Sequence, residues 1–101
     1  MTNPRPLNQR ELNLMEFYSN CQLGMSPQRF RSKWALTYEQ IALICNRSVS
    51  HVRFWFSRGR NYRRPTSTDK RHLALVDFLL EHNQDIPPRL WSLLCPPHQD
   101  E

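Results

Sequence analysis

Apolar residues recur at intervals of three and four along most of the chain, a spacing that places them on one face of an α-helix. The clearest example is TYEQIALICNRSVSHVRFWFSRGR, residues 37–60, where two apolar faces flank the polar tetrad NRSV. No run alternates apolar and polar residues as a half-buried strand would, and the chain has only two glycines. We therefore predict an all-α protein without a substantial sheet.

Two helices are predicted before this segment. The first has a weak apolar side and is expected to end near Gly24; that side comprises Leu7, Leu12, Met15 and either Phe17 or Tyr18. Ser26 followed by Pro27 marks the start of the second helix, because serine accepts hydrogen bonds from first-turn amides and proline there removes no helical bond. Phe30 and Trp34 then share one face.

Capping residues divide residues 37–60 into two helices. Thr37 and Gln40 form a capping box, in which each side chain can bond the other residue's amide. The apolar residues that follow are Ile41, Ile44 and Cys45. Ser48 caps the next helix, which we expect to end at Gly59. In that helix Val49, Val52, Trp55 and Phe56 recur at intervals of three and four. If Val52, Trp55 and Phe56 face the core, helical spacing turns Ser50, Arg53, Phe54 and Ser57 outward.

Two more helices are predicted after a basic loop in which Pro65 prevents the preceding helix from continuing. One of Thr66, Ser67, Thr68 and Asp69 caps KRHLALVDFLLEH, whose apolar stripe comprises Leu73, Val76, Leu79 and Leu80. The short segment DIPPRLWSLLC forms the last helix.

A chain of 101 residues can bury one small core. We predict one compact domain with these parts: N-terminal arm and helix, 1–25; helical core, 26–60; basic loop, 61–71; C-terminal helices, 72–95; and tail, 96–101.

The formal net charge of the whole chain is +5, and its basic residues are concentrated in one quarter of its length. Residues 47–71 contain eight of them against the single acid Asp69: Arg47, Arg53, Arg58, Arg60, Arg63, Arg64, Lys70 and Arg71. From residue 72 onward acids predominate, with Arg89 the single lysine or arginine. This asymmetry indicates a phosphate-bearing partner for the middle of the chain and another role for its C-terminal part.

Other function classes lack their sequence signals. The three cysteines form no C-x-x-C pair, which favours reduced thiols, with Cys45 a small core residue. No apolar run has the length of a signal peptide or membrane span, so we expect a cytoplasmic, nucleoid-associated protein. No nucleophile motif, glycine-rich phosphate loop or metal-spaced cluster occurs. We expect no catalysis, cofactor, metal or small-molecule ligand.

The segment from Gln40 to Trp55 resembles the helix-turn-helix of DNA-binding proteins, particularly the trihelical kind in the DNA-contacting region of sigma factors. The matching positions are the small residue Ala42 at the helix crossing, Ile41 and Cys45 before the turn, and Val52 and Trp55 after it. Asn46 replaces the frequent turn glycine, and asparagine tolerates the left-handed conformation. Over about residues 26 to 95 the chain also looks like small helix-turn-helix proteins of cyanobacteria.

The resemblance implies a trihelical core and assigns roles to individual residues. Base-reading positions carried over from the family are Ser48, Val49, Ser50, Arg53 and Phe54. Arg53 can donate two hydrogen bonds to guanine, and Val49 or Phe54 can contact a thymine methyl group. Residues assigned to phosphates are Arg47, His51, Ser57, Arg58, Arg60, Arg63 and Arg64. The alternatives are that Phe54 marks a protein interface and that the arginines form a solvated face.

These features favour a sequence-preferring double-stranded DNA-binding protein, most plausibly a transcription regulator. The alternatives are an adaptor that docks on a larger transcription complex, such as polymerase, and a DNA-binding module of a mobile-element or recombination protein. A homodimer could read two half-sites. Its predicted surface comprises Leu73, Val76, Phe78, Leu80, Leu90, Trp91 and Leu94, which otherwise complete the core of the monomer.

Overall fold

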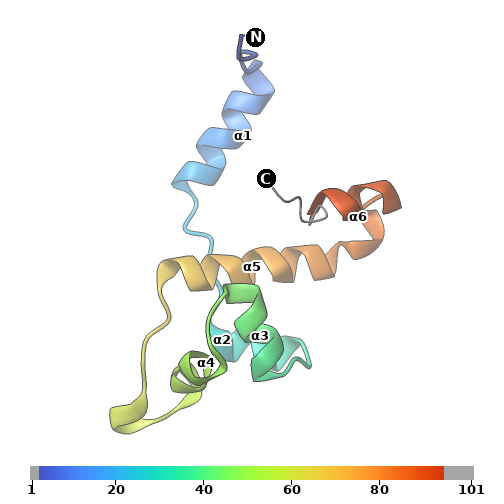
Figure 1. Ribbon diagram of the computed structural model, residues 1–101. Coiled ribbons are helices and arrows are strands. Elements are labelled where there is room, and N and C mark those ends of the chain that lie inside the picture. The colour runs from blue at the N-terminus through green and yellow to red at the C-terminus, as the bar shows by residue number, and fades with distance from the viewer. Residues whose placement is uncertain (1–2, 95–101) are drawn as a thin grey trace.

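This computed structural model describes residues 3–94, which form six α-helices and two short 3-10 helices joined by loops (Figure 1). In chain order they are α1 (Gln9–Asn20), α2 (Pro27–Lys33), α3 (Tyr38–Cys45), α4 (Val49–Phe56), η1 (Gly59–Asn61), α5 (Ser67–Glu81), η2 (Asn83–Asp85) and α6 (Pro88–Leu94). No β-strand occurs among these residues, so the predicted all-α fold class is confirmed. Cys95 and the predicted tail, 96–101, lie outside the described residues.

Side-chain caps confirm the predicted helix starts. At each start a hydroxyl oxygen accepts a hydrogen bond from the amide three residues later, and these caps are Ser26, Thr37, Ser48 and Thr66. The predicted capping box of Thr37 and Gln40 is also present. Because first-turn amides have no partner within their own helix, these local bonds decide where each helix begins.

The end of α4 differs from the prediction, since the helix stops before Gly59. The Phe54 carbonyl accepts hydrogen bonds from the amides of Ser57 at 3.4 Å and Arg63 at 3.0 Å, and the Arg53 carbonyl accepts one from the Ser57 hydroxyl at 2.8 Å. These bonds satisfy carbonyls of the last turn without a left-handed residue. Gly59, with φ of 66°, instead begins η1.

The core lies where α5 crosses α2 and α3, which both also pack against α4 (Figure 1). Its buried apolar residues are Met25, Phe30, Ile41, Ala42, Cys45, Val52, Trp55, Leu73 and Ala74. The predicted burial of Ile41, Cys45, Val52 and Trp55 is therefore confirmed, whereas Phe56 is only partly buried. Burial raises the pKa of the Cys45 thiol to about 11, so this group stays uncharged at neutral pH.

A polar cluster joins the end of α2 to α5. Lys33 Nζ lies 2.8 Å from Asp77 Oδ1 and 2.6 Å from Glu81 Oε1, and Trp34 Nε1 donates to Asp77 at 2.9 Å. The hydrogen bond from Lys33 is the largest cause of a lowered pKa at Asp77. These contacts tie the end of α2 to the second half of α5.

The C-terminal helices contribute both to the core and to the surface. Leu73 is wholly buried, so its predicted place on a partner surface is wrong, because α5 directs this side chain into the core. Two further positions predicted for that surface pack partly against the core, Val76 and Leu80. Three remain exposed, Phe78, Leu90 and Trp91. The side chain of Leu94 lies outside the described part of the chain.

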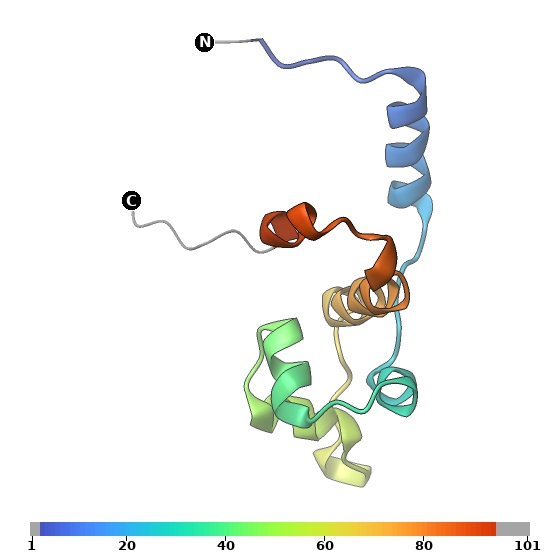
Figure 2. The ribbon, with the colours of Figure 1, turned by 90° about the vertical axis from the view of Figure 1, so that its right-hand side faces the viewer.

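The first helix, α1, stands apart from the core. None of its residues is buried, and Figures 1 and 2 show it projecting beyond α5, away from α3 and α4. The radius of gyration is 17.0 Å, compared with about 13 Å for a compact domain of this length. The packed unit is therefore α2 to α5. No described helix, α1 included, is both long enough and apolar enough to cross a membrane.

Candidate nucleic-acid interface

Three residues, Asn46, Arg47 and Ser48, form the corner between α3 and α4. Asn46 adopts the left-handed conformation, with φ of 55° and ψ of 49°, as its position at the turn predicts. The Arg47 amide donates to the Ala42 carbonyl at 2.9 Å, and the Asn46 amide donates to Leu43 at 3.4 Å. These bonds close the end of α3 and turn the chain directly into the cap of α4.

The outward face of α4 is defined by two buried residues, Val52 and Trp55, on its inner face. Four of the predicted base-reading positions are exposed, Ser48, Ser50, Arg53 and Phe54. Val49 is instead half-buried against the core. The Ser48 oxygen accepts a hydrogen bond from the His51 amide at 3.1 Å, which leaves the hydroxyl hydrogen available to a ligand. The exposed face is thus a small polar surface centred on Arg53.

Arg47 anchors the corner to α5. Its Nε and Nη2 donate to the two carboxylate oxygens of Asp69 at 2.9 and 3.3 Å. Asp69 also accepts from the Thr66 amide and hydroxyl, both at 2.9 Å, and is 1% exposed. Burial by itself raises the pKa of the Asp69 carboxyl, but the hydrogen bonds from Arg47 and Thr66 outweigh it, so the pKa is lowered. The guanidinium predicted to bind phosphate is therefore engaged by a buried carboxylate.

Two other residues assigned to phosphates, His51 and Ser57, have side chains that contact other residues of α4. The hydroxyl of Ser57 donates to the Arg53 carbonyl at 2.8 Å, so its hydrogen is not directed at a ligand. The His51 ring is half-buried and meets the Trp55 ring edge-on, with centroids 5.6 Å apart. Both side chains support the helix from which Arg53 projects.

The segment that follows α4, residues 57–64, is here called the arginine loop. Arg58, Arg60 and Arg64 are exposed in it. Arg63 holds the loop together: its amide donates to the Phe54 carbonyl at 3.0 Å, and its Nη1 donates to the carbonyls of Arg60 and Tyr62 at 2.9 and 3.0 Å. Its guanidinium also lies over the Phe54 ring, 5.8 Å from the centroid. Phe54 is thus partly covered by the loop.

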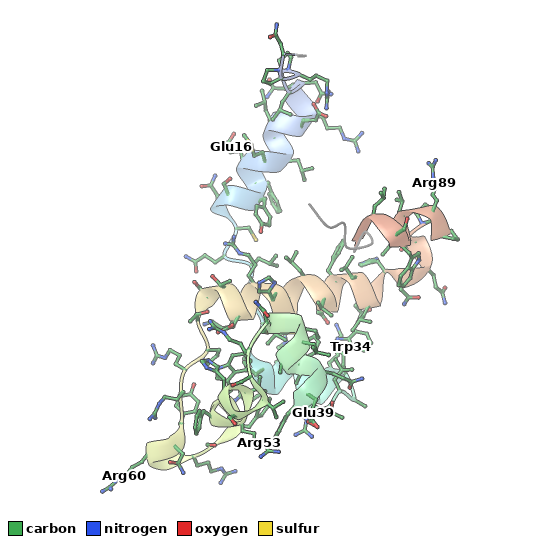
Figure 3. All side chains as sticks on the ribbon, viewed as in Figure 1. Glu16, Trp34, Glu39, Arg53, Arg60 and Arg89 are labelled. Carbon is green, nitrogen blue, oxygen red and sulfur yellow. The ribbon has the colours of Figure 1, made fainter. Side chains whose placement is uncertain are left out.

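The exposed guanidinium groups of α4 and the arginine loop lie at one end of the molecule. Figure 3 shows Arg53 and Arg60 at the end opposite α1, whereas Glu16 and Arg89 lie on the other side of α5. The arginine loop follows α4 directly, and Arg58, Arg60 and Arg64 in it are exposed like Arg53. Such a basic surface can bind a polyanion and place the Arg53 guanidinium against chemical groups of that polyanion.

The sequence did not predict an aromatic cluster at the C-terminal end of α4. The rings of Tyr38 and Phe56 stack with centroids 4.8 Å apart, and the Arg31 guanidinium lies 4.5 Å from the Tyr38 centroid. Together they line an open hollow of about 730 Å³. Arg31 and Tyr38 belong to different helices, and Phe56 to a third, so spacing along the chain carries no signal for the contact.

Within residues 3–94, no group of His, Cys, Asp and Glu side chains is arranged to hold a metal ion.

No protein-family model, curated protein or solved structure shows significant similarity to this chain. Its function must therefore be inferred from the geometry and charge of the chain itself.

Proposed function

We propose that the protein binds double-stranded DNA with a sequence preference and acts as a transcription regulator. In this proposal α3 and α4 form a helix-turn-helix within a trihelical core, and α4 enters the major groove. The observation that carries the proposal is the exposed face of α4, with Arg53 at its centre, continued by the arginines of the adjoining loop.

Arg53 is the proposed base reader. A guanidinium can donate two parallel hydrogen bonds to O6 and N7 of guanine, a pattern that no other base pair presents in the major groove. Ser50 lies less than one turn before Arg53, and Ser48, five residues before Arg53, caps the start of the same helix. Both can bond neighbouring base edges or phosphates. Val49 is a weaker candidate for a thymine contact because it is half-buried against the core.

Arg58, Arg60 and Arg64 are the proposed ligands of the DNA backbone, since all three are exposed. If each of the five arginines assigned to phosphates neutralised one phosphate, log affinity would fall with log salt at a slope of roughly −4 to −5. Arg47 and Arg63 are engaged within the protein, so three of the five arginines remain, and the expected slope of log affinity against log salt is about −3.

Selection of bound duplexes from a random pool tests the proposal directly. We expect enrichment of a short motif that contains guanine, with an affinity that falls as salt rises along the slope given above. Failure to enrich any motif, together with binding that is indifferent to salt, would remove the proposal.

A second function, docking on a protein of the transcription machinery, is favoured by a different observation. Phe78, Trp91 and Leu93 are exposed on α5 and α6 at 60%, 53% and 69%. Large exposed apolar side chains on successive helices are available to a protein partner. This adaptor function predicts a protein complex that does not weaken with salt, so the same salt titration distinguishes the two functions.

A further inference from the structure

Hydrogen bonds within the protein hold the arginine loop in one shape. The Tyr62 amide donates to the Gly59 carbonyl at 3.2 Å, and the Arg63 amide donates to Phe54 in α4. The Arg63 side chain bonds two further loop carbonyls, those of Arg60 and Tyr62. A loop already held in one conformation loses little entropy when it binds. One arginine is thus used to shape a surface that the others present.

Arg60 lies at the tip of this loop. It belongs to η1, directly after Gly59, where no atom lies within 4 Å of the position that a Cβ would occupy. Within the described residues, no side chain pairs with the Arg60 guanidinium, and Figure 3 shows Arg60 at the extremity of the molecule. Arg58 and Arg64 lie on either side of the tip along the chain. The loop therefore presents one leading cation flanked by two others.

The position of the loop relative to α4 decides what it can reach on DNA. A helix of eight residues is about 12 Å long, which is roughly the width of the major groove. A segment that continues beyond the C-terminal end of such a helix meets the phosphates that border the groove, and behind them lies the minor groove. Arg58 and Arg64 suit those phosphates. Arg60, which exposure alone assigns to a phosphate as well, lies at the tip of the loop and would reach past them.

We infer that the arginine loop enters the minor groove beside the recognition site and that Arg60 makes the protein prefer a narrow, A·T-rich flank there. This inference rests on the proposed DNA binding. A·T-rich segments have a narrow minor groove with an enhanced negative potential, which attracts an inserted arginine. A G·C pair places the amino group of guanine in the same groove and obstructs the insertion.

The test uses the full chain and one selected duplex whose flank is changed while its central motif is kept. The three flanks contain A·T, G·C or inosine·cytosine pairs. Inosine lacks the minor-groove amino group of guanine but keeps its major-groove O6 and N7 acceptors. We expect the A·T and inosine·cytosine flanks to bind about tenfold more tightly than the G·C flank. An inosine·cytosine flank that behaves like G·C would show major-groove reading and overturn the inference.

Two matched variants separate the inference from the proposed function. Arg60→Ala should abolish the difference between flanks while keeping the preference for the central motif. Arg64→Ala should weaken binding to all three duplexes alike and keep the difference. Retention of the flank preference in Arg60→Ala overturns the inference but leaves DNA binding intact. Absence of any motif preference in the unaltered protein removes both.

Discussion

At the residue scale, Asp69 connects the corner between α3 and α4 to the start of α5. Its carboxylate accepts from Arg47 in the corner and from Thr66 at the start of α5, and it is almost completely buried. A buried charge is tolerated only when such partners replace its water. Through Arg47, Asp69 therefore positions the corner and with it the start of α4. Through Thr66, it holds the start of α5, the helix that covers the core.

Replacing Asp69 by Asn should destabilise the fold in a pH-dependent manner. The pKa of Asp69 is lowered from its ordinary value of 3.8, so its stabilising contribution is complete above that pH and is lost as pH falls through the lowered value. We expect the free energy of unfolding to fall by about 2–3 kcal/mol at neutral pH, and by much less in acid. Urea denaturation at both pH values measures this.

Asp85→Asn serves as the control for Asp69, because the Asp85 side chain is 79% exposed. It should change the unfolding free energy by no more than about 0.5 kcal/mol. A loss at Asp69 that is the same at neutral and acid pH would contradict the role given to its ion pair with Arg47.

Arg53 and Arg64 should differ in the kind of binding they support. Arg53→Ala should reduce discrimination at one guanine of the selected motif by about ten- to a hundredfold, because the lost bonds are to a base. Arg64→Ala should weaken motif and non-motif duplexes equally and make the salt slope shallower by about one. Affinities for the motif and for duplexes changed at single positions provide the comparison. Uniform loss in both variants would show that Arg53 is not the reader.

At the scale of elements, α4 depends on its neighbours. A helix of eight residues does not persist in water by itself, so α4 needs the burial of Val52 and Trp55 and the cap at Ser48. Its direction is set by the corner, where Asn46 holds the left-handed conformation. The corner therefore determines where Arg53 points.

Substitutions at Asn46 should reveal the conformational demand of this corner. Asn46→Ala should lower the free energy of unfolding by about 1 kcal/mol, since a Cβ without a compensating polar group is disfavoured at positive φ. Asn46→Gly should keep the stability or increase it, because glycine has no Cβ. Chemical denaturation of both variants gives the test. An alanine variant as stable as the glycine variant would contradict this account.

At the scale of the whole molecule, the arginine loop and most of the exposed apolar side chains occupy different places. Figure 3 shows Arg60 of the loop at one end of the molecule. Most of the large exposed apolar side chains lie on α1, α5 and α6, although Leu43, Phe54 and Tyr62 are exposed as well. The two shorter dimensions of the molecule are 33 and 31 Å. Half-sites on DNA lie about 34–36 Å apart for one helical turn, so two molecules side by side fit adjacent half-sites.

For the DNA-binding function we predict a homodimer that buries the exposed residues of α5 and α6, whereas the adaptor function would cover them with another protein. Phe78→Glu should shift the protein toward monomer in sedimentation, because a charge would be buried in the contact. Leu43→Glu is the control, since Leu43 is exposed on α3 and lies outside that surface. A monomer at high concentration in the unaltered protein would remove the dimer.

Much of the fold follows from signals that act over three or four residues. The caps at Ser26, Thr37 and Ser48, and the spacing of Val52 and Trp55, predict the helix starts and the inner face of α4. Those features depend on bonds within one turn and on helical periodicity. The outward position of Arg53 follows from the same periodicity.

Other features depend on residues that are distant in sequence, and only the tertiary structure decided them. Arg47 pairs with Asp69, Leu73 enters the core, and Phe54 accepts a bond from Arg63 beyond the end of α4. Local spacing is the same whether a guanidinium faces solvent, a phosphate or a buried carboxylate. Local caps and helical periodicity therefore predict the helices, and composition predicts the basic segment. Packing decided which arginines are structural and which remain available to a ligand, because burial and pairing arise only when separate helices meet.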